Sequence, residues 1–309
     1  MSDEHSSEDH PVLARLTPLF EACWSYDEFT RLMPWGASSE GQAIAYSTTG
    51  RVTGDSLSGS LRLSQYPRWR VDGTLLPDVH GIIETDASEQ VAIRAGGYGF
   101  QVQDAPEDRI VLHWMRFWSG TPALAGLNAT LAFGAGRFTN TDGLARLRYF
   151  SAAPATEPFE PPAGAPGLEL LGTVNWSYPE YASVHPFGDD EGVGYATSTG
   201  RVDGGPLAGT WRCWHYPTYL RNGLYQLDAH AEIRTSEGVI LNRHGGLATR
   251  SSQLYADLLH DVVQHGTFIS EIPALASLND TLAVGVGFVR GPGRVTLSYY
   301  GLSVLAEPA

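Results

Sequence analysis

Apolar and polar residues alternate one by one along much of this chain. Between positions 57 and 64, Leu or Gly at the odd positions alternates with Ser or Arg at the even ones. The same period of two returns near the other end, where Val295, Leu297 and Tyr299 alternate with Thr296 and Ser298. These runs are bounded by Gly, Pro or Asp, which is typical of an antiparallel β-barrel or sandwich. A barrel is favoured, because closure removes exposed strand edges.

Helices are predicted only as short pieces. Candidate segments are Thr121 to Gly126, its counterpart Ile272 to Ser277, and a third segment from Leu254 to Val263. Each is too short to form a layer of its own. The sequence therefore predicts an all-β fold.

The chain repeats itself. Trp24-Ser-Tyr returns at Trp176, an offset of 152, and the Arg before a double Gly at Arg94 returns at Arg243, an offset of 149. Longer matches join positions 49–52 to 199–202 and positions 122–125 to 273–276. Self-similarity at a fixed period indicates a tandem duplication.

The repeat divides the chain into four segments. Most of the linker is rich in Pro, Ala and Glu and has no periodicity, which is typical of a semi-extended spacer. We expect a disordered acidic N-terminus at 1–12, a first barrel at 13–151, a Pro-rich linker at 152–166 and a second barrel at 167–309.

Composition excludes several classes of function. The net charge is -14, and all 20 basic residues are Arg, so Schiff-base chemistry, pyridoxal phosphate attachment and a phosphate-loop lysine are excluded. An acidic chain without a basic patch predicts no nucleic acid and no membrane as partners, and no apolar run is long enough to span a bilayer. Cys23 and Cys213 occupy non-equivalent places in the repeats, which predicts free thiols and a cytoplasmic location. No cofactor is expected.

Short motifs in each half resemble a known family. The second half contains Leu227-Asp228, Arg243 before a Gly turn, and Leu278-Asn279, and the first half contains Asp78, Arg94, Phe117 and Leu127-Asn128. Each half thereby resembles the bacterial and fungal lipocalin-like β-barrel domain family of unknown function, whose single-copy members are about half as long as this chain. The resemblance implies two tandem antiparallel lipocalin-like β-barrels and leaves the activity open.

One constellation of polar residues occurs in both halves. Asp228 and His230 alternate with alanines, so strand geometry places both on one face, and Asp78 and His80 repeat the pattern. We expect these pairs to point into the barrels and to move a proton, with the carboxylate fixing the imidazole tautomer. The alternative is a solvated face or a structural ion pair.

Two arginines complete the constellation. Arg94 and Arg243 each end the following strand, where a guanidinium could hold a carboxylate, enolate or phenolate oxygen. Pairing with the Asp of the same repeat is the alternative for both.

Four further residues occur in one repeat alone. Trp114 and Trp118 could line a pocket for an apolar ring, with core packing as the alternative. His244 and His265 could belong to a substrate pocket that arose in one barrel after duplication, with drift on a surface as the alternative. No His, Cys or acidic cluster has convincing metal spacing, so no metal is expected.

These observations favour an enzyme. The leading hypothesis is a cofactor-independent isomerase, cyclase or lyase that uses acid–base chemistry on a small hydrophobic or aromatic oxygenated metabolite held in a barrel. A non-catalytic binding or carrier protein is the alternative, and a structural assembly unit is a third. We also expect the two repeats to pair as an intramolecular pseudo-dimer, with a homo-oligomer left open.

Overall fold

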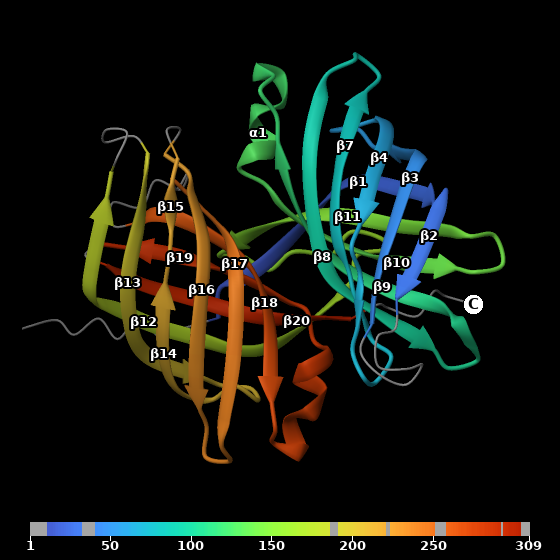
Figure 1. Ribbon diagram of the computed structural model, residues 1–309. Coiled ribbons are helices and arrows are strands. Elements are labelled where there is room, and N and C mark those ends of the chain that lie inside the picture. Colours follow the sequence, from blue (N-terminus) through green and yellow to red (C-terminus); the bar gives the residue numbers. More distant parts are fainter. Residues whose placement is uncertain are drawn as a thin grey trace, which may run out of the picture.

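Two closed antiparallel barrels make up the computed structural model (Figure 1). The structure describes residues 11–32, 41–185, 191–220, 223–250, 258–291 and 293–303. Strand pairing runs full circle in each half, through β1, β3, β4, β7, β8, β9, β10 and β11 in the first and through β12, β13, β14, β16, β17, β18, β19 and β20 in the second. The all-β prediction with two related antiparallel barrels is confirmed.

The strands of the first half follow one another with short connections. In chain order they are β1 (Leu13–Ser25), β2 (Glu28–Leu32), β3 (Gly41–Thr53), β4 (Gly59–Gln65), β5 (Arg68–Trp69), β6 (Leu75–Leu76), β7 (Asp78–Thr85), β8 (Gln90–Val102), β9 (Ala105–Trp118), β10 (Leu131–Thr139) and β11 (Leu144–Ala155).

The second half repeats this order with fewer short strands. Its strands are β12 (Gly167–Val184), β13 (Gly192–Asp203), β14 (Gly209–His215), β15 (Thr218–Tyr219), β16 (Tyr225–Arg234), β17 (Val239–Arg250), β18 (Leu258–Ser270), β19 (Ala283–Arg290) and β20 (Arg294–Ser303).

Each barrel has its own core on the inside. Alternate residues of the strands that form the two barrels point inward, as the period of two predicts, whereas β2 is exposed along its whole length. Trp24 and Trp176 are equivalent and both are buried in these cores, beside Tyr149 in the first barrel and Tyr299 in the second. The repeated Trp residues thus act as core side chains.

Two of the three predicted helical segments are helical. They are η1 (Pro122–Leu124) with α1 (Ala125–Asn128), and η2 (Pro273–Asp280). The third prediction is wrong over positions 258–263, which belong to β18, and positions 254–257 lie outside the described residues. Val263 on the outer face packs against the first barrel while Val262 fills the interior. Apolar residues on both faces hide the period of two from the sequence.

The predicted ends of the first barrel need two corrections. Strand β11 continues to Ala155 and pairs there with β1, so the linker begins four residues later than expected. Pro154 fits because β11 pairs with β10 only as far as Ser151, which leaves no ladder on that side for Pro154 to break. Val12 is buried, and its N–H donates to Ser298 Oγ of the second barrel at 2.9 Å. Residues 1–10 of the predicted disordered segment lie outside the described residues.

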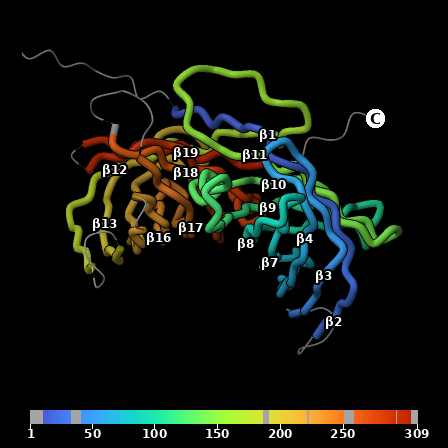
Figure 2. The backbone as a smooth tube through the Cα atoms, turned by 90° about the horizontal axis from the view of Figure 1, so that it is seen from above, coloured from blue at the N-terminus to red at the C-terminus, as the bar shows by residue number. Residues whose placement is uncertain are grey.

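The barrels lie side by side and share a third core (Figure 2). We call this contact the junction; it buries apolar side chains from the outer faces of β8–β11 and β17–β20, among them Leu131, Phe133, Leu282 and Val284. Outer-face burial of this kind turns two separate domains into one packed unit. No helix among the described residues is long and apolar enough to cross a membrane.

Truncation of Phe133 tests how much the junction contributes to the free energy of unfolding. Its side chain is 0% exposed, and Phe133→Ala should lower the free energy of unfolding by about 3–5 kcal/mol in urea denaturation. Phe29, which is 51% exposed, provides the control, and Phe29→Ala should change it by less than about 0.5 kcal/mol. Equal effects of the two substitutions would contradict the packing described here.

Candidate functional site

The predicted Asp–His pairs lie on the outside of the barrels. Val79 and Ala229 are the residues that point into the cores, so Asp78, His80 and their equivalents take the opposite face. The side chains of Asp78 and His80 are each 47% exposed, and Asp228 and His230 are exposed as well. The expectation that these pairs point into the barrels is therefore wrong. The alternation of polar and apolar residues shows which residues share a face of the strand, but not which face points inward. Here the apolar residues between each Asp and His point into the barrel.

The first-half constellation nevertheless forms. His80 Nε2 lies 3.2 Å from Asp78 Oδ1, and the nearest guanidinium nitrogen of Arg94 lies 3.8 Å from the same oxygen. Within the described part of the chain, no equivalent ion pair joins Asp228 with His230 or Arg243. The structure thus brings the three predicted residues together in one barrel only.

Trp114 and His265 meet at the junction. Their rings are stacked with centroids 4.1 Å apart and an interplanar angle of 5°. The two positions are equivalent in the repeat, and equivalent residues contact each other only across a twofold relation between the halves. Each ring contacts a glycine of the neighbouring strand, Gly96 for Trp114 and Gly245 for His265, where an added Cβ would approach the ring to 3.0 Å.

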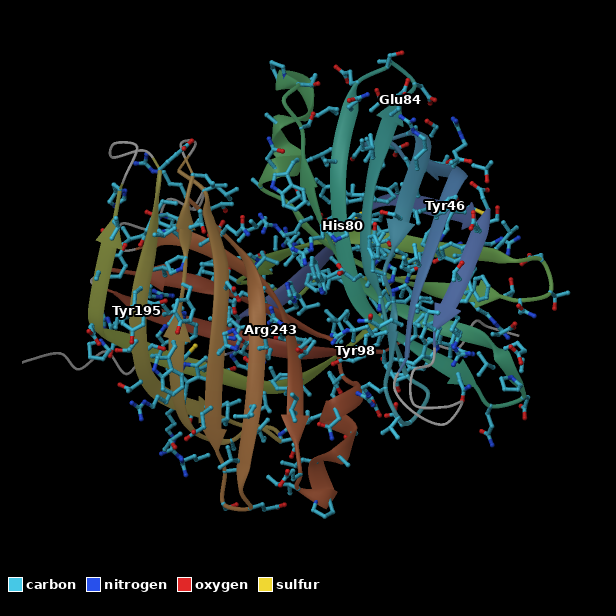
Figure 3. All side chains as sticks on the ribbon, in the orientation of Figure 1. Tyr46, His80, Glu84, Tyr98, Tyr195 and Arg243 are labelled. Atoms are coloured by element: carbon cyan, nitrogen blue, oxygen red, sulfur yellow. The ribbon has the colours of Figure 1, made fainter. Side chains whose placement is uncertain are left out.

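Positive charge gathers around this stack. Burial lowers the pKa of His265 to about 3, and Arg116, Arg243 and Arg94 add to the effect. Figure 3 labels His80 and Arg243 near the line where the barrels meet. Two of these arginines, Arg94 and Arg243, come from the predicted constellation, one from each barrel.

Arg116 is the anomalous member of this group. It is only 7% exposed, and its Nε is buried without a hydrogen-bond partner among the described residues. Its guanidinium lies over the ring of Trp118 at 4.9 Å, and no carboxylate pairs with it in the described chain. Burial and the charge of Arg94 lower the pKa of Arg116 to about 10.

Strand register gives the layout of the outer face around Arg116. Across β7, β8 and β9, one row of neighbours is His80, Arg94 and Arg116. The adjacent row is Ile82, Ala92 and Trp118, in which Ile82 is 38% and Trp118 37% exposed. A charged row therefore borders a partly exposed apolar row. We call these six residues the β7–β9 face.

A second polar group lies inside the second barrel. One potential ligand atom from each of Cys213, His215 and His244 lies within 4.8 Å of the others, and all three residues are buried. His244 Nδ1 lies 2.7 Å from Asn242 Oδ1, and His215 Nε2 lies 2.8 Å from Ser198 Oγ. Burial lowers the pKa of His215 to about 4 and raises that of the Cys213 thiol.

The first barrel is filled differently. Leu63, Gln65 and Ala95 stand where the second barrel has Cys213, His215 and His244. The core around Leu63 encloses a cavity of about 10 Å³, room for roughly one water molecule.

The predicted pocket residues fall into three separate places. Trp114 and His265 form the stack at the junction, Trp118 lies on the β7–β9 face, and His244 lies inside the second barrel. Three important residues were not predicted. Arg116 carries no motif, but Cys213 and His215 are two apart on one strand, and this spacing could have marked a shared face.

Solved structures that are similar to this chain each match slightly less than half of it. No family model and no curated protein matches it. A β-barrel-like protein from Acinetobacter baumannii AYE is 18% identical, with a TM-score of 0.41, over 46% of this chain and 98% of that one. An enzyme from Penicillium herquei is 18% identical, with a TM-score of 0.38, over 46% of this chain and 97% of its own. A conserved protein of unknown function from Rhodopseudomonas palustris is 15% identical, with a TM-score of 0.40, over 46% and 99%.

Burial of His113 predicts how stability depends on pH. Its pKa is lowered from 6.5 to about 4 by burial, and its Nδ1 lies 3.0 Å from Tyr149 Oη. Below pH 6.5 the unfolded chain takes up a proton that the folded protein excludes, so the free energy of unfolding falls until about pH 4. In the second barrel, Gln264 accepts the equivalent hydrogen bond from Tyr299 at 3.1 Å.

His113→Gln should therefore keep the tyrosine hydrogen bond and remove the titration. We expect the slope of unfolding free energy against pH, measured in urea between pH 4 and 6.5, to become shallower by about 1.4 kcal/mol per pH unit. His230→Gln, a change at an exposed position without an ion-pair partner among the described residues, is the control and should change the slope less than His113→Gln does. An identical slope in His113→Gln and wild type would refute the assignment.

Proposed function

We propose that the protein binds a small aromatic anion, an arenecarboxylate or a phenolate, on the β7–β9 face beside the junction. The observation that carries this proposal is Arg116, a residue that is 7% exposed, whose Nε is buried without a hydrogen-bond partner and which has no carboxylate partner in the described chain. An unpaired buried charge is strongly destabilising. A bound anion would pair with this charge and remove that cost, so the free energy would appear as ligand affinity.

The charges around Arg116 favour an anion rather than a neutral ligand. Arg94 is its direct cross-strand neighbour, and the second barrel adds Arg243 nearby. Asp78 compensates Arg94 only weakly, at 3.8 Å. A carboxylate or phenolate oxygen would accept charge-assisted hydrogen bonds from Arg116 and Arg94, which are about twice as strong as neutral ones.

The adjoining row supports an aromatic body for the ligand. Trp118 and Ile82 leave more than a third of their surfaces open beside the arginines. A ring attached to the anionic group would lie against Trp118, where offset stacking adds about 0.5–1.5 kcal/mol. The ligand would thus contact both rows at once.

A second candidate function is proton transfer on the same ligand. His80 Nε2 lies 3.2 Å from Asp78 Oδ1, and His80 belongs to the row that contains Arg94 and Arg116, so its imidazole would be the group that moves the proton. This arrangement suits the predicted cofactor-independent isomerase, cyclase or lyase, with an arginine holding the oxyanion. Binding is the primary proposal, because the unpaired Arg116 requires an anion and the exposed His80 does not require a reaction.

Arg116→Gln tests the proposal with salicylate as the probe. Affinity, measured by calorimetry and by Trp fluorescence, should fall at least tenfold, since a hydrogen bond to a charged group contributes about 1.5–3 kcal/mol. The same substitution should raise the free energy of unfolding without ligand, because it removes an unpaired buried charge. Loss of binding together with a gain in stability is the result that a purely structural arginine would not give.

Arg212→Gln is the matched control. Arg212 lies over Trp214 at 4.9 Å, the same distance as in the Arg116 pair, but on an exposed position of the second barrel. Its substitution should leave salicylate affinity unchanged. Wild-type affinity in Arg116→Gln, or equal losses in the two variants, would reject the proposed site. The second candidate function, proton transfer, makes a further prediction. The His80→Gln variant should bind the aromatic anion with wild-type affinity but no longer convert it to product.

A further inference from the structure

We propose that the second barrel holds a divalent transition-metal ion of the zinc or copper type. Its ligands would be Cys213 Sγ and one ring nitrogen each of His215 and His244. One thiolate and two imidazoles form a borderline-soft donor set that suits these ions and not magnesium or calcium. This site lies inside the barrel, and the inference does not depend on the anion site on the β7–β9 face.

The strands bring the three donors to one place. Cys213 and His215 are two residues apart on β14 and share its inner face, and His244 lies on β17. Between them β16 contributes only Ala229 and Ala231 to the interior. Because these side chains are small, they do not fill the space between Cys213, His215 and His244.

The separations fit an ion after a small movement. Zinc bonds of about 2.3 Å to sulfur and 2.0–2.1 Å to nitrogen place tetrahedral donors roughly 3.4–3.6 Å apart. The observed donor atoms lie within 4.8 Å of one another. Side-chain movements of about 1 Å would bring the donor atoms to the separation that zinc requires. The three protein ligands then leave a fourth coordination position for water or a small ligand.

His244 provides an independent indication. Asn242 Nδ2 donates to the Thr267 carbonyl at 3.2 Å, which turns Asn242 Oδ1 toward His244 Nδ1 at 2.7 Å. That oxygen only accepts, so Nδ1 carries the proton and Nε2 keeps its lone pair. Nε2 is buried, 0% of the residue is exposed, and no described group bonds to it. A metal-binding histidine is oriented in this way, by a hydrogen bond from its other nitrogen.

His215 is also held by a hydrogen-bond partner on one of its ring nitrogens. His215 Nε2 lies 2.8 Å from Ser198 Oγ, which also accepts a hydrogen bond from Trp211 Nε1 at 3.2 Å. The second ring nitrogen of His215 then remains for the ion. Metal binding requires neutral imidazoles and a thiolate, so the ion displaces the thiol proton of Cys213 to solvent as it binds.

The first barrel shows that the fold does not require these residues. Large core residues are kept in both copies, as in the Trp24–Trp176 and Tyr149–Tyr299 pairs. All three donors are absent from the first copy, where Leu63, Gln65 and Ala95 occupy the positions. A complete ligand set in one barrel and none of it in the other points to a site rather than to core packing.

Metal-free full-length protein titrated with Co²⁺ or Zn²⁺ tests the inference. We expect one ion per chain, thiolate-to-cobalt charge-transfer absorption in the near ultraviolet, and release of a proton on binding. Cys213→Leu, which copies the first barrel, should abolish the absorption and weaken binding at least 100-fold. Cys23→Ser is the matched control for the other free cysteine and should bind as wild type does.

X-ray absorption of zinc-loaded wild-type protein decides the question even if a variant misfolds. One sulfur and at least two nitrogen neighbours around the metal are expected, and copper loading of the same protein should give the same donor set. Absence of stoichiometric binding, a first shell without sulfur, or wild-type binding in Cys213→Leu would overturn the inference. Salicylate binding is unaffected by any of these outcomes, so failure here leaves the anion site to its own test.

Discussion

Closure of each sheet into an eight-stranded barrel is the constraint on which every other feature depends. Closure divides each strand into residues that fill the core and residues that face outward, and a shift of one position exchanges the two sets. Both interiors are filled by large side chains such as Tyr149 and Tyr299. Recognition of an organic ligand is therefore proposed on an outer face, since the cavity inside the first barrel is only about 10 Å³.

Duplication lets the two copies diverge around this common frame. The first copy keeps an apolar interior and gains Arg116 and Trp118 on its outer face. The second copy has Thr267 and Ile269 at those positions and instead gains Cys213, His215 and His244 inside. The twofold contact between Trp114 and His265 then places charged residues of both copies around one point. Of these arrangements, the Trp114–His265 stack is the one that requires both barrels.

The sequence predicts the repeat, the strands and the barrels well, because period-two patterning and the recurrence of Trp24 as Trp176 are local signals. It places Asp78 and His80 on one strand face and leaves pairing with Asp78 as one of two alternatives for Arg94; in the structure His80 and Arg94 lie 3.2 and 3.8 Å from Asp78. The sequence does not show on which side of the sheet these residues lie, because Val79 and Ala229 are small enough to fit on either the inner or the outer face. Arg116 escapes prediction entirely, since the alternation along its strand assigns it to the outer face and does not show that an outward-facing residue is buried there.

Arg116 also explains why an acidic chain would bind an anion. The net charge of -14 repels anions at long range, but a partly desolvated guanidinium acts at short range, where the local dielectric is low. Salt and overall charge should therefore affect the rate of association more than the final affinity. The ligand gains its binding energy from Arg116, Arg94 and the ring of Trp118 together.

A crystal structure of the protein grown with salicylate is the most direct measurement. We predict carboxylate density within hydrogen-bonding distance of Arg116 and Arg94, with the ring against Trp118. Ligand density inside either barrel, or an unoccupied β7–β9 face at saturating salicylate, would contradict the proposed site.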